Sequence, residues 1–433
     1  MSVIGLLTFG DTLFFMATDN CICFDNTEYA FEYKKNSDLK NAHFLFSVIG
    51  RPWLVSLGLK LVPFAIKWNF PFVKSILRKT IFQQFVGGED LEATTVVVEK
   101  MNSYHVQVIL DYGVEGGGNG EMGFDHSAGE FIKVIDFAAT QANIPFMSIK
   151  VTGLSRVGLL EKLDILMNNL EGTLLNKYDK AIDLLNSDEK VEWQKVKERM
   201  FTICERASEK KVGVLIDAEE TWIQDPVDAL SLSMMDSFNR GKRVVYNTLQ
   251  LYRTDRLKFL KDCYDAAEES GFILGVKLVR GAYMENERKR AAQMNYPSPI
   301  QLNKESCDHD FNAAIQFSIT HINKISLIVA SHNEESNLYA TQLLTENELL
   351  PSHPHVHFSQ LYGMSDNVTF NLAKAGYSVS KYLPFGPIKD VIPYLMRRAQ
   401  ENSAVSGLMG RELSLLKKEI NRRVSKINLY KYN

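Results

Sequence analysis

The sequence has few cysteines, and their arrangement does not indicate a structural framework. The 433 residues include five Cys, an odd number spread along the chain, so we expect no disulfide framework and a reducing compartment. Cys21 and Cys23 form a single C-x-C pair. Zinc sites usually need a second pair of ligands at a characteristic spacing, so we expect no metal site there.

An excess of charge of one sign is also missing. Lys+Arg 49 against Asp+Glu 52 leaves a net charge of −3, which gives no electrostatic reason to expect binding to nucleic acid. No Lys or Arg precedes Lys34, so the N-terminus has neither the basic region of a signal peptide nor the composition of a transit peptide. We therefore expect a cytoplasmic protein. Residues 1–20 are predicted to be disordered.

Long hydrophobic runs are absent as well. The apolar stretch from Phe44 to Phe85 is interrupted by charged residues and prolines, so it contains no run of about 20 apolar residues that could cross a membrane. Two interpretations of its helices stay open. They cover a core, or they lie partly in a bilayer surface with Trp53, Trp68 and the lysines at the interface.

After Gly87 the chain alternates between two patterns. With 45% hydrophobic and 23% charged residues, its composition is that of a soluble globular protein. Segments rich in β-forming residues are separated by helical patterns such as 128–142, 255–270 and 308–323. This alternation predicts a parallel (βα)8 barrel of the TIM type. The eight predicted strands fall within 106–115, 145–154, 212–221, 242–252, 271–283, 325–333, 355–364 and 377–386.

These patterns divide the chain into an N-terminal helical, apolar segment, 1–86, and a barrel, 87–433. A charged helical insertion at about 161–211 is expected to pack on the outside of the barrel. In this fold the carboxyl ends of the strands carry the functional residues. Polar side chains at or just past the predicted strand ends are Lys150, Asp217, Gln250, Lys277, Arg280, Tyr283, His332, Gln360 and Tyr382.

A glycine motif after the first strand has a different explanation from nucleotide binding. Gly118, Gly120 and Gly123 satisfy G-x-G-x-x-G. However, we expect a loop over 116–126 and a helix that begins near Ser127, which leaves the third glycine outside the helix N-terminus that a dinucleotide needs. A flexible loop above a barrel is the preferred interpretation.

Three alternating histidines form the remaining pattern that could bind a metal. They are His353, His355 and His357. A catalytic metal needs further ligands and an open coordination position, and no carboxylate or cysteine pattern supplies them. We therefore expect no metal in this protein.

The segment Asp390–Asn402 is predicted to be a helix with two chemically different faces. Asp390 suits the N-cap and Pro393 suits the first turn. At 100° per residue the functional side chains share one face, opposite Ile392, Leu395, Met396 and Ala399. That face holds Tyr394, Arg397, Arg398 and Glu401. It is either a solvated charged surface or a site for a small carboxylate, which paired guanidinium groups bind in a bidentate manner.

Seven motifs, in order, carry a resemblance to a known family over about residues 85–405. They are LDYGVEG, IDAEET, VKLVRGAYMENER, ASHN, FSQLYGM, KYLPFGP and PYLMRRAQEN. In these motifs the chain resembles the proline dehydrogenase family. The resemblance implies a barrel whose last helix lies over its mouth, non-covalently bound FAD, and oxidation of L-proline to Δ1-pyrroline-5-carboxylate. This is the first step of proline degradation to glutamate, and a membrane quinone is the implied electron acceptor.

The resemblance also implies roles for individual residues. Arg397 and Arg398 match the arginines that hold the proline carboxylate, and the other substrate-binding positions are Lys150, Tyr394 and Leu361. The implied catalytic residues are Asp217, Lys277, Tyr382 and Glu401, with Lys277 standing where many bacterial members have Arg. Glu115 matches a gate residue. The positions that match FAD contacts are Ala218, Gln250, Arg280, Gly281, Ala282, Tyr283, Ser331 and His332.

Two alternative functions stay open at this point. Hydroxyproline dehydrogenases resemble the same family but carry a small hydroxylated residue where Tyr382 stands, and a barrel that only binds proline would retain the arginine pair. A quinone acceptor is consistent with a peripheral position on the inner face of the cell membrane, or on the mitochondrial inner membrane in a eukaryote. The sequence leaves the oligomeric state open.

Overall fold

Eight parallel strands form the centre of the structure. The structure is a computed structural model, and it describes residues 22–51, 73–113, 120–404 and 406–431, together with positions 53, 55, 56, 58, 61 and 68. Each strand pairs with the next and β8 pairs with β1, so the sheet closes into a barrel. The predicted fold is confirmed. The expected disorder of residues 1–20 lies outside the described residues. The strands are β1 (Gln107–Tyr112), β2 (Phe146–Ile149), β3 (Gly213–Ile216), β4 (Val245–Gln250), β5 (Leu274–Val279), β6 (Ile325–Ala330), β7 (Val356–Leu361) and β8 (Val379–Phe385).

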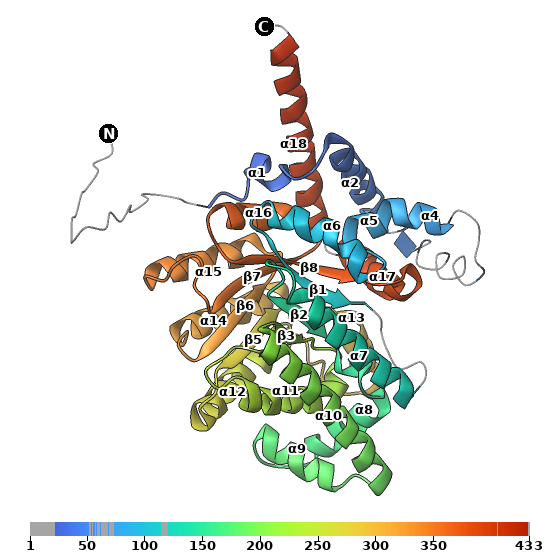
Figure 1. Ribbon diagram of the computed structural model, residues 1–433, viewed down its shortest axis with the longest axis vertical. Helices are drawn as coiled ribbons and strands as arrows, with labels where there is room; N and C mark the ends of the chain where they lie inside the picture. Colours follow the sequence, from blue (N-terminus) through green and yellow to red (C-terminus); the bar gives the residue numbers. More distant parts are fainter. Residues whose placement is uncertain are drawn as a thin grey trace, which may run out of the picture.

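Helices alternate with the strands and surround the barrel (Figure 1). Short helical turns η2 (Val151–Gly153) and η3 (Thr221–Ile223) follow β2 and β3. The helices of this layer are α6 (Leu91–Asn102), α7 (Glu121–Ala138), α11 (Gln224–Phe238), α12 (Arg256–Ser270), α13 (Met284–Met294), α14 (Lys304–Thr320), α15 (Glu334–Glu346), α16 (Asp366–Lys374) and α17 (Ile388–Ala404).

Two predicted helix starts, besides that of α17, were wrong. Helix α7 begins at Glu121 rather than near Ser127, so Gly123 lies in its first turn and not in a loop. Two carboxylates of this turn bind the guanidinium of Arg199, a contact that a local pattern does not contain. Helix α14 begins at Lys304 instead of 308, because the side chain of Asn303 accepts a hydrogen bond from the backbone N–H of Ser306 at 2.8 Å.

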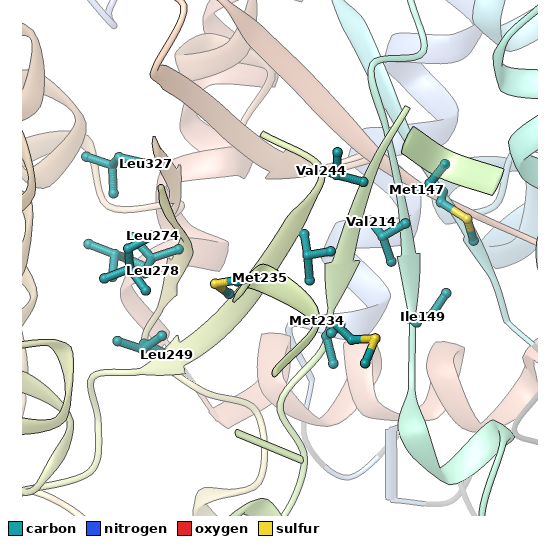
Figure 2. Packing of buried hydrophobic residues seen from close by; sticks show 14 of the residues in the cluster. Met147, Ile149, Val214, Met234, Met235, Val244, Leu249, Leu274, Leu278 and Leu327 are labelled. Atoms are coloured by element: carbon teal, nitrogen blue, oxygen red, sulfur yellow. The ribbon is translucent and has the colours of Figure 1, made fainter. Parts of the chain in front are cut away.

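The main hydrophobic core lies between the strands and the surrounding helices. Figure 2 shows part of it, where Met234 and Met235 of α11 lie among side chains of the strands, including Val214 and Leu249. These residues are at most 5% exposed. Because side chains of a strand alternate between its two faces, every second residue of each strand points into this outer core. The intervening residues point into the barrel.

A second, smaller cluster fills the inside of the barrel. Ile109, Leu215, Tyr246 and Ile328 come from four different strands and are at most 3% exposed. The hydroxyl of Tyr246 is 3.0 Å from that of Ser326. Gly275 makes room for this ring, since a Cβ atom there would lie 2.2 Å from a backbone oxygen and 3.0 Å from the ring. Side chains therefore fill the interior of the barrel at this level, and in this fold ligands bind at the carboxyl ends of the strands.

The charged stretch 161–211 contains helices on the outside of the barrel. They are α8 (Val157–Asn168), α9 (Leu174–Asp183) and α10 (Ser187–Lys210), at the end of the molecule opposite α18 in Figure 1. Trp193 is fully buried and donates a hydrogen bond to the hydroxyl of Tyr178 at 3.0 Å. Asn186 caps α10, with Glu189 completing a capping box.

Helices from both ends of the chain lie side by side at the opposite end of the molecule (Figure 1). Phe31, Phe46 and Phe85 are buried with Leu415 and Leu416 in one cluster, which also contains part of α17. The helices are α1 (Thr27–Phe31), α2 (Asn36–Ile49), α4 (Val73–Leu77), the π-helical η1 (Arg78–Phe82), α5 (Gln83–Phe85) and α18 (Ser406–Lys431). In the described part of the chain, no helix combines the length and hydrophobicity needed to cross a bilayer.

Buried polar contacts join these terminal helices to α16. The hydroxyl of Tyr33 donates to Asp366 at 2.7 Å, and Lys381 of β8 lies 2.9 Å from the same carboxylate. Lys34 is 3.4 Å from it on the other side. From α18, Arg423 donates to the carbonyl of Phe31 at 2.7 Å. The N-terminal segment therefore binds both the barrel, through Asp366, and the C-terminal helix, through Arg423.

The three alternating histidines have structural hydrogen bonds. Only His357 lies on a strand, and its Nε2 is 2.5 Å from the hydroxyl of Ser380 inside the barrel. Burial lowers the pKa of His357 to about 3. The Nδ1 of His355 is 2.7 Å from the carbonyl of Ile322. Among the described residues, no group of His, Cys, Asp and Glu is arranged to bind a metal ion.

Candidate active site

Helix α17 follows β8 directly, and its start differs from the prediction. Gly386 turns the chain with φ of +140°, and the carbonyl of Pro387 then accepts hydrogen bonds from the N–H groups of Asp390 at 2.8 Å and Val391 at 3.2 Å. The helix therefore begins at Ile388, which puts Asp390 inside the first turn rather than at the N-cap. Pro393 lies one turn deeper than predicted, where its missing N–H interrupts the helical hydrogen-bond pattern.

Both predicted faces of α17 are packed to some degree. Leu395 is 2% exposed in the cluster of the terminal helices, as expected. Tyr394, which shares the opposite face with the arginines, is 7% exposed. Arg397 and Arg398 are half-buried, and the guanidinium of Arg398 lies 5.3 Å from the centre of the Tyr394 ring. A fully solvated charged face is therefore excluded for these three residues.

A small cavity lies beneath this face of α17. Tyr394 and Arg397 line it from above, and Asp111, Lys150 and Thr152 line it from the ends of β1 and β2. Its volume is about 20 Å³, which is room for about one water molecule. The side chains at this end of the barrel therefore pack closely around the cavity.

Next to the cavity, a buried ion pair joins β3, β5 and β8. The carboxylate of Asp217 binds the ammonium of Lys277 through one oxygen and accepts a hydrogen bond from the hydroxyl of Tyr382 at 2.7 Å through the other. Lys277 also lies 5.4 Å from the centre of the Tyr382 ring. Burial opposes ionisation of Asp217, but the charge of Lys277 and these hydrogen bonds outweigh it and lower the pKa of Asp217.

Sequence reasoning missed two further carboxylic acids at this site. Asp111 of β1 is 8% exposed, and burial, together with the nearby charge of Asp217, raises its pKa to about 6. Glu219 is 8% exposed, accepts a hydrogen bond from the hydroxyl of Thr152 at 2.8 Å, and has a pKa raised by burial. Both residues belong to the motifs LDYGVEG and IDAEET, so their positions at strand ends were the available signal.

We expect Asp111→Asn to stabilise the protein at pH 8 and to have no effect at pH 4. The folded pKa of Asp111 is raised, so its favourable contribution is complete below the unfolded value of about 4 and is lost as pH rises through about 6. The expected gain at pH 8 is about 2–3 kcal/mol. Thermal unfolding of both proteins at the two pH values tests this. An equal difference at both pH values would show that Asp111 does not titrate in this range.

On the β5–β6 side, Arg280 is held by three partners. Its guanidinium donates to Asp308 at 2.8 Å, to Ser331 at 2.6 Å and to Ser336 at 2.9 Å. The Nδ1 of His332 is 2.9 Å from the hydroxyl of Ser365. Burial, with smaller effects of nearby cations that include Lys381 and Arg398, lowers the pKa of His332 to about 3, so this ring is neutral.

The other predicted positions on β3 to β5 surround the same end of the barrel. Gly281 has φ of +135°, and a Cβ atom there would lie 2.4 Å from the ring of Tyr252, so only glycine fits. Ala218 is half-buried beside Asp217, whereas Ala282 is exposed. Burial raises the pKa of Tyr283 to about 12.

Of the four remaining predicted positions, the structure describes two fully, one in part and one not at all. Gln250 is 2% exposed and donates to the backbone carbonyl of Glu219 at 3.1 Å. Leu361, at the end of β7, packs against the cluster that contains Tyr394. Glu115 lies outside the described residues. Glu401 lies in α17, but its side chain is outside the described part.

The structure thus brings most of the predicted residues to one end of the barrel. Lys150, Tyr394 and Arg397 meet at the cavity, and Asp217, Lys277 and Tyr382 form the adjoining network. Arg280, Ser331 and His332 lie on the far side, towards α14 and α16. The arrangement brings cationic and anionic side chains together at one end of the barrel.

Comparisons with known proteins point in the same direction. The model of a family described as proline dehydrogenase matches residues 95–411. The chain is 32% identical to "Proline dehydrogenase 1, mitochondrial" of Dictyostelium discoideum, over 85% of this chain and 67% of the relative. It is 31% identical to "Hydroxyproline dehydrogenase" of Xenopus laevis, over 80% of this chain and 78% of the relative.

A solved structure has the same fold. Proline utilization A from Bdellovibrio bacteriovorus, in a form inactivated by N-propargylglycine, superposes with a TM-score of 0.66 at 20% identity. The match covers 93% of this chain but 42% of that one, so the chain spans less than half the length of this larger protein. The barrel, the motifs and the match over residues 95–411 agree, and the chain belongs to the proline dehydrogenase family.

Proposed function

We propose that the protein oxidises L-proline to Δ1-pyrroline-5-carboxylate by hydride transfer from C5 to FAD, with a membrane quinone as the final acceptor. The observation that carries this proposal is the position of Arg397, which lines the cavity together with Lys150 and Asp111. Two cations and an acid at one small cavity match the carboxylate and ammonium of an amino acid. Family membership supports the same reaction.

Each group of the site has a distinct part in this proposal. Arg397 and Arg398 hold the substrate carboxylate by charge-assisted hydrogen bonds, with Lys150 beside them. Asp217 stays ionised and fixes Lys277 and Tyr382, so these side chains orient the substrate without rearranging. Asp111, with a pKa of about 6, is the acid best suited to exchange a proton with the substrate ammonium near neutral pH.

Residues of β4 to β6 suit a non-covalently bound FAD. Gln250 Oε1 and Thr248 Oγ1 are buried at this end and have no hydrogen-bond partner among the described residues, so they have capacity for a ligand. Arg280 supplies positive charge, and the absence of a side chain at Gly281 allows close approach to the backbone. When bound, FAD would supply the acceptor for the hydride, which carries both electrons of the oxidation.

Two measurements test the proposed reaction. The purified chain should be yellow or become so with added FAD, and it should reduce an artificial dye only when proline is present. Colourless protein that cannot be reconstituted would refute the enzymatic function. Flavin binding without proline-dependent reduction would instead favour the alternative of a barrel that only binds proline.

Hydroxyproline is the alternative substrate, because a hydroxyproline dehydrogenase is among the relatives. We expect Tyr382 in β8 to determine whether proline or hydroxyproline is the better substrate. A ring packed against the substrate leaves no room for a C4 hydroxyl, so we expect proline to be favoured over trans-4-hydroxyproline by roughly 10- to 200-fold in kcat/KM. Tyr382→Ser should narrow this ratio. Tyr382→Phe, which keeps the ring and removes the hydrogen bond to Asp217, should preserve it. A ratio unchanged in both variants would place the selectivity elsewhere.

We also propose that the surface of α2 and α4 contacts a membrane. The support for this proposal is that large apolar side chains of this segment are exposed: Phe44 is 65% exposed, Trp53 65% and Ile76 60%. Truncation at Gly87 would not test this cleanly, because it also removes the buried Phe85.

Point substitutions provide the test of membrane contact. Phe44→Ser with Ile76→Ser should reduce co-sedimentation with anionic liposomes several-fold, because burial of these side chains in the interface is lost. The matched control is Leu302→Ser with Leu350→Ser, since these leucines are 90% and 70% exposed on the barrel. Equal sedimentation of the two double variants would contradict the proposal.

A further inference from the structure

The C-terminal helix α18 contacts the ends of β6 and β7 through two adjacent residues, Arg411 and Glu412. Glu412 is 6% exposed, and its carboxylate accepts a hydrogen bond from the backbone N–H of Ser365 at 2.5 Å. Arg411 donates to both carboxylate oxygens of Glu334, at 2.8 and 2.9 Å. The first contact holds the loop after β7, and the second holds the start of α15, which follows β6. The first turns of α18 therefore hold two neighbouring segments at the carboxyl end of the barrel.

The loop after β7 has an uncommon backbone conformation at Ser365. Its φ is +49°, in the left-handed region that residues other than glycine rarely adopt. Such a conformation persists only where surrounding contacts hold it. The fully buried ammonium of Lys381 donates to the carbonyl of Met364 at 2.5 Å and lies 2.9 Å from the carboxylate of Asp366. With the contact from Glu412, these bonds fix three successive residues of the loop from outside it.

The side chain of Ser365 connects this loop to His332. Its hydroxyl is 2.9 Å from Nδ1 of the imidazole, which follows β6. His332 is half-buried, and the charge of Arg398 is among the causes that lower its pKa, so the ring lies near the arginine pair of α17. Because Ser365 contacts Nδ1, the nitrogen that can face a ligand is Nε2. One contact therefore fixes both the direction of the ring and the nitrogen that it presents.

We infer that Glu412 and Ser365 are positioning residues, which hold the imidazole of His332 in the orientation that binds FAD. This inference rests on the proposed function, in which His332 contacts FAD. Glu412 fixes the backbone of Ser365 and the Ser365 hydroxyl fixes the ring, so α18 acts on the cofactor site without touching the cofactor. A side chain that is already held in its bound orientation loses less conformational entropy on binding. Glu412 lies just past residues 95–411, which the family model matches, so the family motifs do not include it.

Three substitutions in the full chain test this role. Ser365→Ala removes one hydroxyl and leaves every ion pair in place, and Glu412→Ala removes the acceptor of the Ser365 N–H. Each should weaken FAD binding about 3- to 10-fold, the range expected for the loss of one hydrogen bond. Glu412→Gln retains an acceptor oxygen, so its FAD affinity should match that of the wild type. Titration of the flavin-free protein with FAD, followed by flavin fluorescence, gives the dissociation constants.

Arg423→Met is the matched control, because it distinguishes positioning from a general loosening of α18. Arg423 donates to the carbonyls of Phe31 and Lys34, so its loss weakens the packing of α18 on the N-terminal segment and leaves the contacts of Glu412 in place. FAD affinity should equal that of the wild type. An equal loss of affinity in Arg423→Met and Glu412→Ala, or an unchanged affinity in both Ser365→Ala and Glu412→Ala, would overturn the inference. Ser365→Ala gives this comparison whether or not Glu412→Ala folds.

A second readout does not need FAD. NMR of the flavin-free chain with nitrogen-15-labelled histidine reports the ring nitrogens, and the signals lost in His332→Gln identify those of His332 among the nine histidines. They should shift in Ser365→Ala and Glu412→Ala and stay at the wild-type positions in Glu412→Gln and Arg423→Met. Ring signals that do not respond to Ser365→Ala would overturn the inference. A wild-type chain that binds no FAD would refute the proposed function, and the ring signals would then still decide whether Ser365 and Glu412 hold His332.

Discussion

Replacing Arg397 or Arg398 by Met is expected to raise the apparent KM for proline at least about tenfold, since a charge-assisted contact at a site shielded from water contributes a few kcal/mol. Leu395 keeps its packing against the terminal helices in both variants, so we expect α17 to stay folded and the flavin to stay bound. Steady-state kinetics, together with the absorbance spectrum of each variant, measure both quantities.

The same helix supplies a matched control for this prediction. Lys389 is an exposed cation of α17, so Lys389→Met removes one positive charge without touching the cavity. Its KM should equal that of the wild type. If neither arginine variant differs from Lys389→Met, this face of α17 does not hold the carboxylate, and the proposed substrate geometry fails.

The second large effect is expected for Lys277→Met, which leaves the buried carboxylate of Asp217 without its counterion. Breaking a buried ion pair on one side typically costs about 3–5 kcal/mol of stability, and Lys277 and Asp217 are 6% and 14% exposed. The pKa of Asp217 is lowered in the wild type, so its stabilising contribution is present above about pH 4 and is lost as pH falls through the folded value. In Lys277→Met this pKa rises, so the variant should be less stable at pH 8 than at pH 5.

Two further variants serve as comparisons in this experiment. Lys277→Met combined with Asp217→Asn removes both charges and should recover much of the lost stability. Lys258→Met breaks an exposed pair with Asp262 on α12, and there the expected loss is below about 1 kcal/mol. Thermal unfolding of the four proteins gives the comparison. Equal losses for Lys277→Met and Lys258→Met would mean that the inner pair is solvated and contributes little.

How much of the molecule could be predicted from sequence depended on whether the signal was local. The barrel could be predicted because each buried strand has its own apolar pattern. The start of α7 could not, because its first turn is fixed by Arg199, 74 and 78 residues away from the two acids that it binds. Similarly, the helical period places Tyr394 on the polar face of α17, but contacts with distant helices bury it.

In the candidate site, too, some residues could be identified from the sequence and others could not. Arg397 and Lys150 stand out by residue type and position, and the structure brings both to one cavity. Asp111 stands near a strand end within a motif, but the sequence does not show that its carboxyl is buried. Its raised pKa comes from burial and from Asp217, two conditions that exist only after the barrel has closed.

The N-terminal segment makes its native contacts with residues that the ribosome synthesises much later. Tyr33 binds Asp366 across 333 residues, and Phe31 accepts its hydrogen bond from Arg423 across 392. A ribosome makes about 5–20 residues per second, so the first helices wait at least tens of seconds for these partners. During that interval Phe31 and Phe46, which are buried in the finished protein, have to remain exposed or be covered by a chaperone. Assembly of this end of the molecule therefore follows the synthesis of the whole barrel.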